Sequence, residues 1–102
     1  MSDGATPDDS DPATALHERL VATETLPVER DAGWRLGEAQ ALAADIATGD
    51  PDAAIVRERA GEIRTLLAAI DGTGDETADE HVAAARELAA QVADRSEDAS
   101  EA

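Results

Sequence analysis

The chain has 102 residues, no cysteine and a formal net charge of −16, with 24 acidic residues against eight basic residues, all of them Arg. This length fits one domain, and the lack of cysteine excludes disulfides, thiolate metal sites and a thiol nucleophile. An acidic surface without a basic cluster argues against nucleic acid as a partner, and the lack of an 18-residue apolar run or a signal-peptide pattern favours a cytoplasmic protein that does not bind membranes.

The first predicted element is a helix that opens at Asp11-Pro12. Residues 1–10, mostly Asp, Ser, Gly and Pro, have almost nothing to bury and are predicted to form a disordered acidic tail. An Asp N-cap accepts a hydrogen bond from a free amide and Pro fits the first helical position, so this pair favours a helix start. The helix is short, about four turns, because the residue before Pro27 avoids the α conformation.

The second and third helices are predicted to be antiparallel neighbours. The second runs from Pro27 to about Thr48 with an apolar stripe at helical spacing, and Gly49 ends it. Asp50-Pro51 repeats the start signal, and a connection this short forces the third helix to run back beside the second. The third helix, over residues 55–70, carries the bulkiest stripe of the chain and is expected to organise the core through Val56, Ala60, Ile63, Leu67 and Ile70.

A fourth helix follows the Gly-rich turn at 71–76. Thr77-x-x-Glu80 forms a capping box for it, and Thr73-x-x-Glu76 is a competing start four residues earlier. An alanine-rich face continues to Arg95. Residues 96–102 are predicted to form a second disordered acidic tail.

These elements predict one domain over residues 11–95. No stretch alternates β-branched and polar residues over a strand's length. The predicted fold class is all-α, an antiparallel helical bundle of three long helices plus a shorter N-terminal helix. Because alanine buries little apolar area per residue, such a bundle would gain from a partner subunit.

Trp34 is the only aromatic residue of the chain. On an ideal helix it points away from the core stripe, toward the side that holds Gly37 and Ala41, so these three residues form a candidate interaction surface. Two interpretations remain open. Either the first helix covers Trp34, or Trp34 is an exposed anchor for a partner or a second subunit.

Arg59 and His81 are polar residues within the core stripes. Arg59 needs a carboxylate, for which Glu38 is the expected partner, or must extend to water; an anion-binding role is the alternative. His81 is expected to be half-buried, with a ring nitrogen that meets a backbone or carboxylate group. Metal binding is the alternative for His81, but His17 is the only other histidine and no Glu-x2-His pair occurs. We therefore predict no metal, no cofactor and no catalytic residue.

The composition resembles that of proteins from the salt-accumulating haloarchaea, in which carboxylates are in excess, Arg replaces Lys and Ala is abundant. Molar salt screens the self-repulsion of such a surface. Three segments are similar to those of a group of small uncharacterised haloarchaeal helical proteins: Leu26-Pro27-Val28, Trp34-x-Leu36-Gly37-Glu38-Ala39, and Asp71-Gly72-Thr73-Gly74-Asp75 through His81-Val82-Ala83-Ala84-Ala85-Arg86. The resemblance implies the organism and the compartment, and it brings no activity and no site residue.

Three functions remain open from the sequence. The first is a non-enzymatic protein-interaction or scaffold module of a halophilic cytoplasm, which binds an unknown protein partner or forms a homodimer. The second is an acidic nucleic-acid mimic that binds a basic protein, which two rows of carboxylates would favour. The third is a metal-binding or enzyme site around His81, with Asp79 or Glu80.

Overall fold

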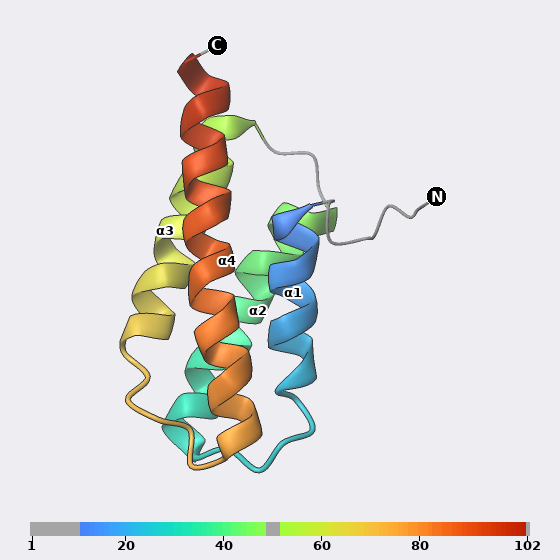
Figure 1. The fold of residues 1–102 in the computed structure, drawn as a ribbon, viewed down its shortest axis with the longest axis vertical. Helices are drawn as coiled ribbons and strands as arrows, with labels where there is room; N and C mark the ends of the chain where they lie inside the picture. The colour runs from blue at the N-terminus through green and yellow to red at the C-terminus, as the bar shows by residue number, and fades with distance from the viewer. Residues whose placement is uncertain (1–10, 49–51, 102) are drawn as a thin grey trace.

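Four α-helices make up the part of the chain that the computed structural model describes, residues 11–48 and 52–101, with side chains described for 11–47 and 52–94. They are α1 (Pro12–Ala22), α2 (Arg30–Thr48), α3 (Ala53–Ala68) and α4 (Glu76–Glu101). No strand occurs in these ranges, which confirms the prediction of an all-α protein. Successive helices run in alternating directions along the long axis of the molecule (Figure 1). The predicted tail at 1–10 lies outside the described residues, as do Gly49 and Asp50-Pro51.

α1 begins as the sequence predicts and ends earlier. The Asp11 side chain accepts a hydrogen bond from the Ala13 amide at 3.2 Å, and Pro12 occupies the first turn. The helix ends at Ala22, and the buried Thr23 donates its hydroxyl hydrogen to the Leu20 carbonyl at 2.6 Å.

α2 begins at Arg30, three residues after the predicted start at Pro27. Residues 27–29 belong to the α1–α2 connection, and the backbone amides of Val28 and Glu29 donate their hydrogen bonds outside α2. The Val28 amide donates to the Leu26 carbonyl at 2.9 Å, and the Glu29 amide donates to the Thr73 carbonyl at 2.7 Å. The second of these bonds joins the α1–α2 connection to the turn before α4.

The starts of α3 and α4 depend on aspartates that the sequence patterns did not single out. The Asp52 side chain accepts a hydrogen bond from the Ile55 amide at 3.1 Å and caps α3. α4 starts at Glu76, and Asp75 caps it by accepting from the Ala78 amide at 2.9 Å. Neither predicted capping box is therefore used.

α4 continues to Glu101, beyond the predicted end at Arg95. Neither Gly nor Pro follows Gly74 in the sequence, so no residue of the kind that breaks helices interrupts it. None of the four helices, over the ranges given above, combines the length and the apolar character that crossing a bilayer requires.

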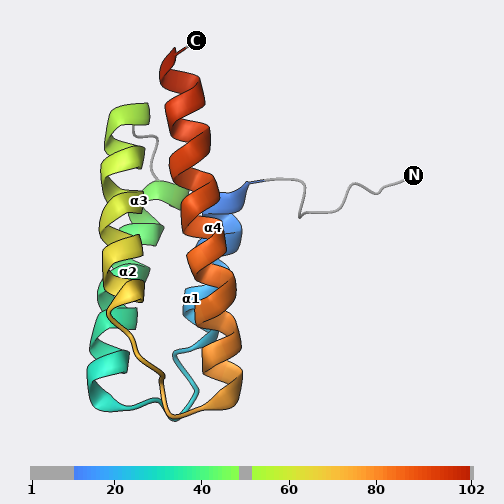
Figure 2. The ribbon, with the colours of Figure 1, turned by 60° about the vertical axis from the view of Figure 1, so that its left-hand side comes forward.

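The core lies between the four helices, and Ile63 and Leu67 of α3 are among its largest fully buried side chains. Leu16 and Leu20 of α1 are also fully buried. α3 packs against α2 and α4, and α1 packs against the same two helices (Figures 1 and 2). Alanines without exposed surface complete the core: Ala39, Ala43, Ala60, Ala85 and Ala89.

The predicted stripe of α3 is confirmed over most of its length. Ala60 and Ile70 are buried with Ile63 and Leu67, whereas Val56 is half-buried and packs against the edge of the core. Ile55, in the first turn, is 40% exposed. The core therefore begins one turn inside the helix.

Candidate interaction surface

Trp34 is exposed over 63% of its surface, so the interpretation that the first helix covers it is wrong. Leu16 and Leu20, the large side chains of α1 that could have covered it, are directed into the core and have no exposed surface. Gly37 and Ala41 are exposed as well, and a Cβ atom added to Gly37 would meet no other atom within 4 Å. The three residues of the predicted surface are thus accessible together on α2.

A groove of about 580 Å³ lies beside this surface, between α2 and α3. Its apolar lining comes from residues of both helices: Ala41, Leu42, Gly61 and Leu66. Four carboxylates also line it: Glu38 and Asp45 from α2, and Glu58 and Glu62 from α3. All four are exposed, so they form an acidic rim around an apolar floor.

Trp34 lies in line with one wall of the groove. At 3.6 residues per turn, Trp34, Glu38, Ala41 and Asp45 fall within about 60° of one another on α2. The facing wall repeats the pattern, since Glu58, Gly61, Glu62 and Thr65 are spaced i, i+3, i+4 and i+7 on α3. Trp34 therefore lies on the same face of α2, about one helical turn before Glu38, the first residue of α2 that lines the groove.

Gly61 leaves the floor of the groove open. A Cβ atom added there would meet no other atom within 4 Å, so the small residue is not required by packing inside the domain. Glycine in a helix interior is less favourable than alanine by about 0.5–1 kcal/mol. Gly61 thus lowers helix stability while allowing close approach to the backbone of α3.

Arg59 is half-buried, and its Nε atom is buried without a hydrogen-bond partner. Within the described part of the chain no ion pair joins it to Glu38, so the expected pairing is not found. Glu38 instead belongs to the rim of the groove, and Arg59 is not among the residues that line it.

His81 is half-buried on α4, as predicted, but its partner is a guanidinium. Arg19 Nη1 of α1 lies 3.1 Å from His81 Nδ1. Because Arg has no acceptor, Arg19 donates and Nδ1 accepts, which places the hydrogen of a neutral ring on Nε2. No group of three or more His, Asp and Glu residues suited to a metal ion occurs among the residues described.

Sequence reasoning missed a contact that Arg86 of α4 makes with the C-terminal end of α3. Arg86 Nη2 donates to the carbonyl oxygens of Leu67 and Ile70, at 2.8 Å each, and Nε lies 3.3 Å from the Leu67 oxygen. The guanidinium thus supplies a donor to the Ile70 carbonyl, two residues beyond α3, and a further donor to the Leu67 carbonyl, which also accepts from the Ile70 amide at 3.1 Å. The signal was hard to find because the acceptors precede Arg86 by 16 and 19 residues.

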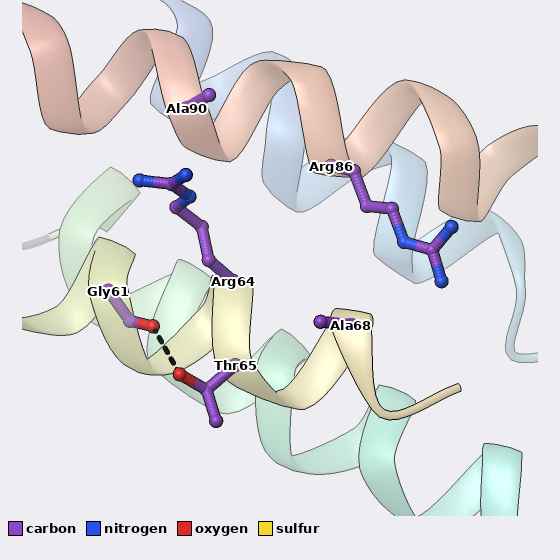
Figure 3. A pocket seen from close by; sticks show the side chains of 6 residues that line it. All are labelled: Gly61, Arg64, Thr65, Ala68, Arg86 and Ala90. Atoms are coloured by element: carbon purple, nitrogen blue, oxygen red, sulfur yellow. Dashed lines mark hydrogen bonds between the residues drawn. The ribbon is translucent and has the colours of Figure 1, made fainter. Parts of the chain in front are cut away.

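A second cavity, of about 480 Å³, lies between α3 and α4 beside Arg86. Figure 3 shows that the guanidinium groups of Arg64 and Arg86 point in different directions from its walls. The Thr65 hydroxyl on the α3 side donates to the Gly61 carbonyl at 3.1 Å and is thus engaged within its own helix (Figure 3). The guanidinium groups of Arg64 and Arg86 therefore do not converge on a common position where an anion could bind.

The Gly-rich turn before α4 is held by Thr73, which is fully buried. Its amide donates to Asp79 Oδ1 at 2.8 Å, and its hydroxyl lies 2.8 Å from the same oxygen. The backbone hydrogen bond from Thr73, then its hydroxyl and the charge of Arg86, hold the pKa of Asp79 below its ordinary value against the opposing effect of desolvation. Gly74 has a φ of 88°, which favours glycine. These contacts make the turn a structural connection.

Together, these features define an all-helical domain with an exposed groove between two of its helices. A family model described as Domain of unknown function (DUF8152) matches residues 12–99, most of the chain from the start of α1 into α4, and the chain belongs to that family. Neither the comparison with curated proteins nor the comparison with solved structures gave a match.

Proposed function

We propose that this protein is a non-enzymatic interaction or scaffold module, built as an antiparallel helical bundle, which binds another protein through the outer face of α2. The observation that carries the proposal is Trp34, which is 63% exposed on a face with Gly37 and Ala41. Trp is enriched among the residues that dominate binding energy at interfaces. The acidic composition supports a salt-rich cytoplasm as the place where this module works.

Site-specific photocrosslinking in cells at native salt tests this proposal. A photoreactive residue at Ala41 is expected to give a discrete adduct with another protein, and Trp34→Ala is expected to remove that adduct. The same photoreactive residue at Ala83, an exposed alanine of α4, is the matched control. No adduct from Ala41, or the same adducts from both positions, would contradict the proposal.

One observation favours the acidic nucleic-acid mimic as a second candidate. The four rim carboxylates stand in two rows, on α2 and α3, as a mimic of two phosphate backbones would require. A mimic binds through charge, so Trp34→Ala would leave its affinity for a basic protein unchanged. Loss of the adduct in Trp34→Ala therefore separates the interaction module from the mimic.

A further inference from the structure

The groove between α2 and α3 has the shape and the charge to receive one particular kind of partner. We propose that it binds a basic amphipathic helix of another protein, whose apolar side chains pack on Trp34 and the groove floor while its Arg or Lys side chains pair with the acidic rim. This inference rests on the proposed function and specifies the partner for the same surface.

The floor of the groove favours a helix as the occupant. Ala41 and Gly61, one on each wall, are small and exposed, and no atom fills the space beside the Gly61 backbone. Two helices approach within about 8–10 Å when small residues lie at their contact. The described residues contain no strand whose edge could pair with an extended peptide, so a helix laid into the groove is the recognition mode that fits.

The rim determines the charge of the occupant. Glu38, Asp45, Glu58 and Glu62 surround an apolar floor that includes Leu42 and Leu66. Carboxylates on both walls attract Lys and Arg on the flanks of a bound helix and speed its association. The apolar floor and Trp34 then select for an apolar stripe between those flanks.

The same rim argues against a second copy of this chain as the occupant. Two copies docked through this face would place four carboxylates opposite four carboxylates, and like charges facing each other at an interface are unfavourable. A basic partner removes that repulsion. The charge of the groove therefore distinguishes a heterologous partner from a homodimer.

Peptide binding to the full chain tests the inference. The probe is a peptide of about 16 residues, long enough to span the three turns of the groove, with Leu at i, i+3, i+4 and i+7 and Arg on both flanks. A scrambled peptide of the same composition, without an apolar face, is the control probe. Trp34 fluorescence and backbone amide NMR shifts report binding at about 0.15 M and about 1 M salt, where the Debye length is about 8 Å and about 3 Å.

Gly61→Leu is the principal variant, because Gly61 lines the groove and a Cβ atom added to it would meet no other atom within 4 Å. We expect it, like Trp34→Ala, to weaken binding of the amphipathic peptide by at least about tenfold. Ala83→Leu adds the same apolar surface to α4 and is expected to leave the affinity unchanged. Ala41→Leu fills the groove from the facing helix and replaces Gly61→Leu if circular dichroism shows that the latter does not fold.

The rim has its own matched pair of variants. Glu38→Gln with Glu62→Gln is expected to weaken binding at 0.15 M salt by about two- to fivefold per residue. Glu80→Gln with Glu87→Gln removes the same charge from an exposed face of α4 and is expected to have little effect. A larger effect of the α4 pair would overturn the assignment of the rim.

Four outcomes would overturn the inference. Equal binding of the scrambled peptide would mean diffuse charge attraction, and unchanged binding to Gly61→Leu and Ala41→Leu would place the peptide elsewhere. Self-association of the free protein that Gly61→Leu abolishes would make a second copy the occupant. If photocrosslinking at Ala41 captures a partner but the amphipathic peptide does not bind, the proposed function stands and this inference fails; if both fail, both are wrong.

Discussion

At the scale of single residues, the contact between Arg86 and the end of α3 is expected to stabilise the fold. Arg86→Met keeps the aliphatic length and removes the donors to the Leu67 and Ile70 carbonyls. The Leu67 oxygen would keep the Ile70 amide as a donor, whereas the Ile70 oxygen would lose the guanidinium donor. Leaving a partly buried acceptor without a donor lowers the free energy of unfolding by about 1–3 kcal/mol. Arg64→Met is the control, because no hydrogen bond or ion pair joins Arg64 to another described residue, and surface changes of that kind stay within about 0.5 kcal/mol. Urea unfolding of both variants measures the difference. An equal loss of unfolding free energy in Arg86→Met and Arg64→Met would contradict a stabilising role for the Arg86 hydrogen bonds.

Asp79 gives a prediction of pH dependence at the same scale. Its pKa is lowered in the folded protein, chiefly by the Thr73 amide, so the contribution of its charge is present above the unfolded pKa of about 3.9 and is lost as pH falls through the lower folded value. The difference in Tm between the natural protein and Asp79→Asn is therefore expected to be largest near neutral pH and to shrink below about pH 4.

Thermal melts of Asp79→Asn across this pH range need a control for net charge, because many carboxylates titrate together. Glu80→Gln removes a neighbouring exposed carboxylate for which the structure gives no bond to the turn. A pH trend of the same size in both variants would assign the effect to general charge. A trend confined to Asp79→Asn supports the role of the Thr73 contact.

At the scale of the helices, α3 is expected to tolerate truncation less well than the alanine-rich α2 and α4. Ile63 and Leu67 of α3, like Leu16 and Leu20 of α1, are large apolar side chains without exposed surface in a core that is otherwise rich in alanine. Ile63→Ala or Leu67→Ala is expected to lower the free energy of unfolding by about 2–5 kcal/mol, because nearby alanines cannot extend to fill the cavity. Leu66→Ala on the same helix is half-buried and should lose less. Urea unfolding checks the order, and an equal loss at Leu66 would contradict it.

The helices were the most predictable feature of this chain, and the helix contacts the least. The Asp11-Pro12 start and the buried part of the α3 stripe follow from residues within a few positions of each other. The exposure of Trp34 depends on which side of α2 the first helix packs, and local spacing does not encode that choice. The Arg86 cap likewise depends on how α3 and α4 are aligned.

Only one wall of the groove could be predicted from the sequence. The spacing of Trp34, Glu38, Ala41 and Asp45 places them on one face of α2, which is readable once the helix is known. That this face meets a matching face of α3, centred on Gly61, follows only from the register of two packed helices. Helix faces are thus predictable one at a time, whereas a groove between them is a tertiary property.

At the scale of the whole molecule, the net charge of −16 is expected to make stability depend on salt. Lowering salt from about 1 M to about 0.1 M lengthens the Debye screening distance from about 3 Å to about 10 Å, so carboxylates on neighbouring helices repel one another. A loss of about 1 kcal/mol would lower Tm by about 4–8 °C in a domain of this size. Glu58→Gln with Glu62→Gln removes an i,i+4 pair of like charges on the groove rim and should raise Tm more at low salt than at high salt. Circular dichroism melts of both proteins across this range measure the effect, and a Tm independent of salt would contradict a role for the acidic surface in a salt-rich cytoplasm.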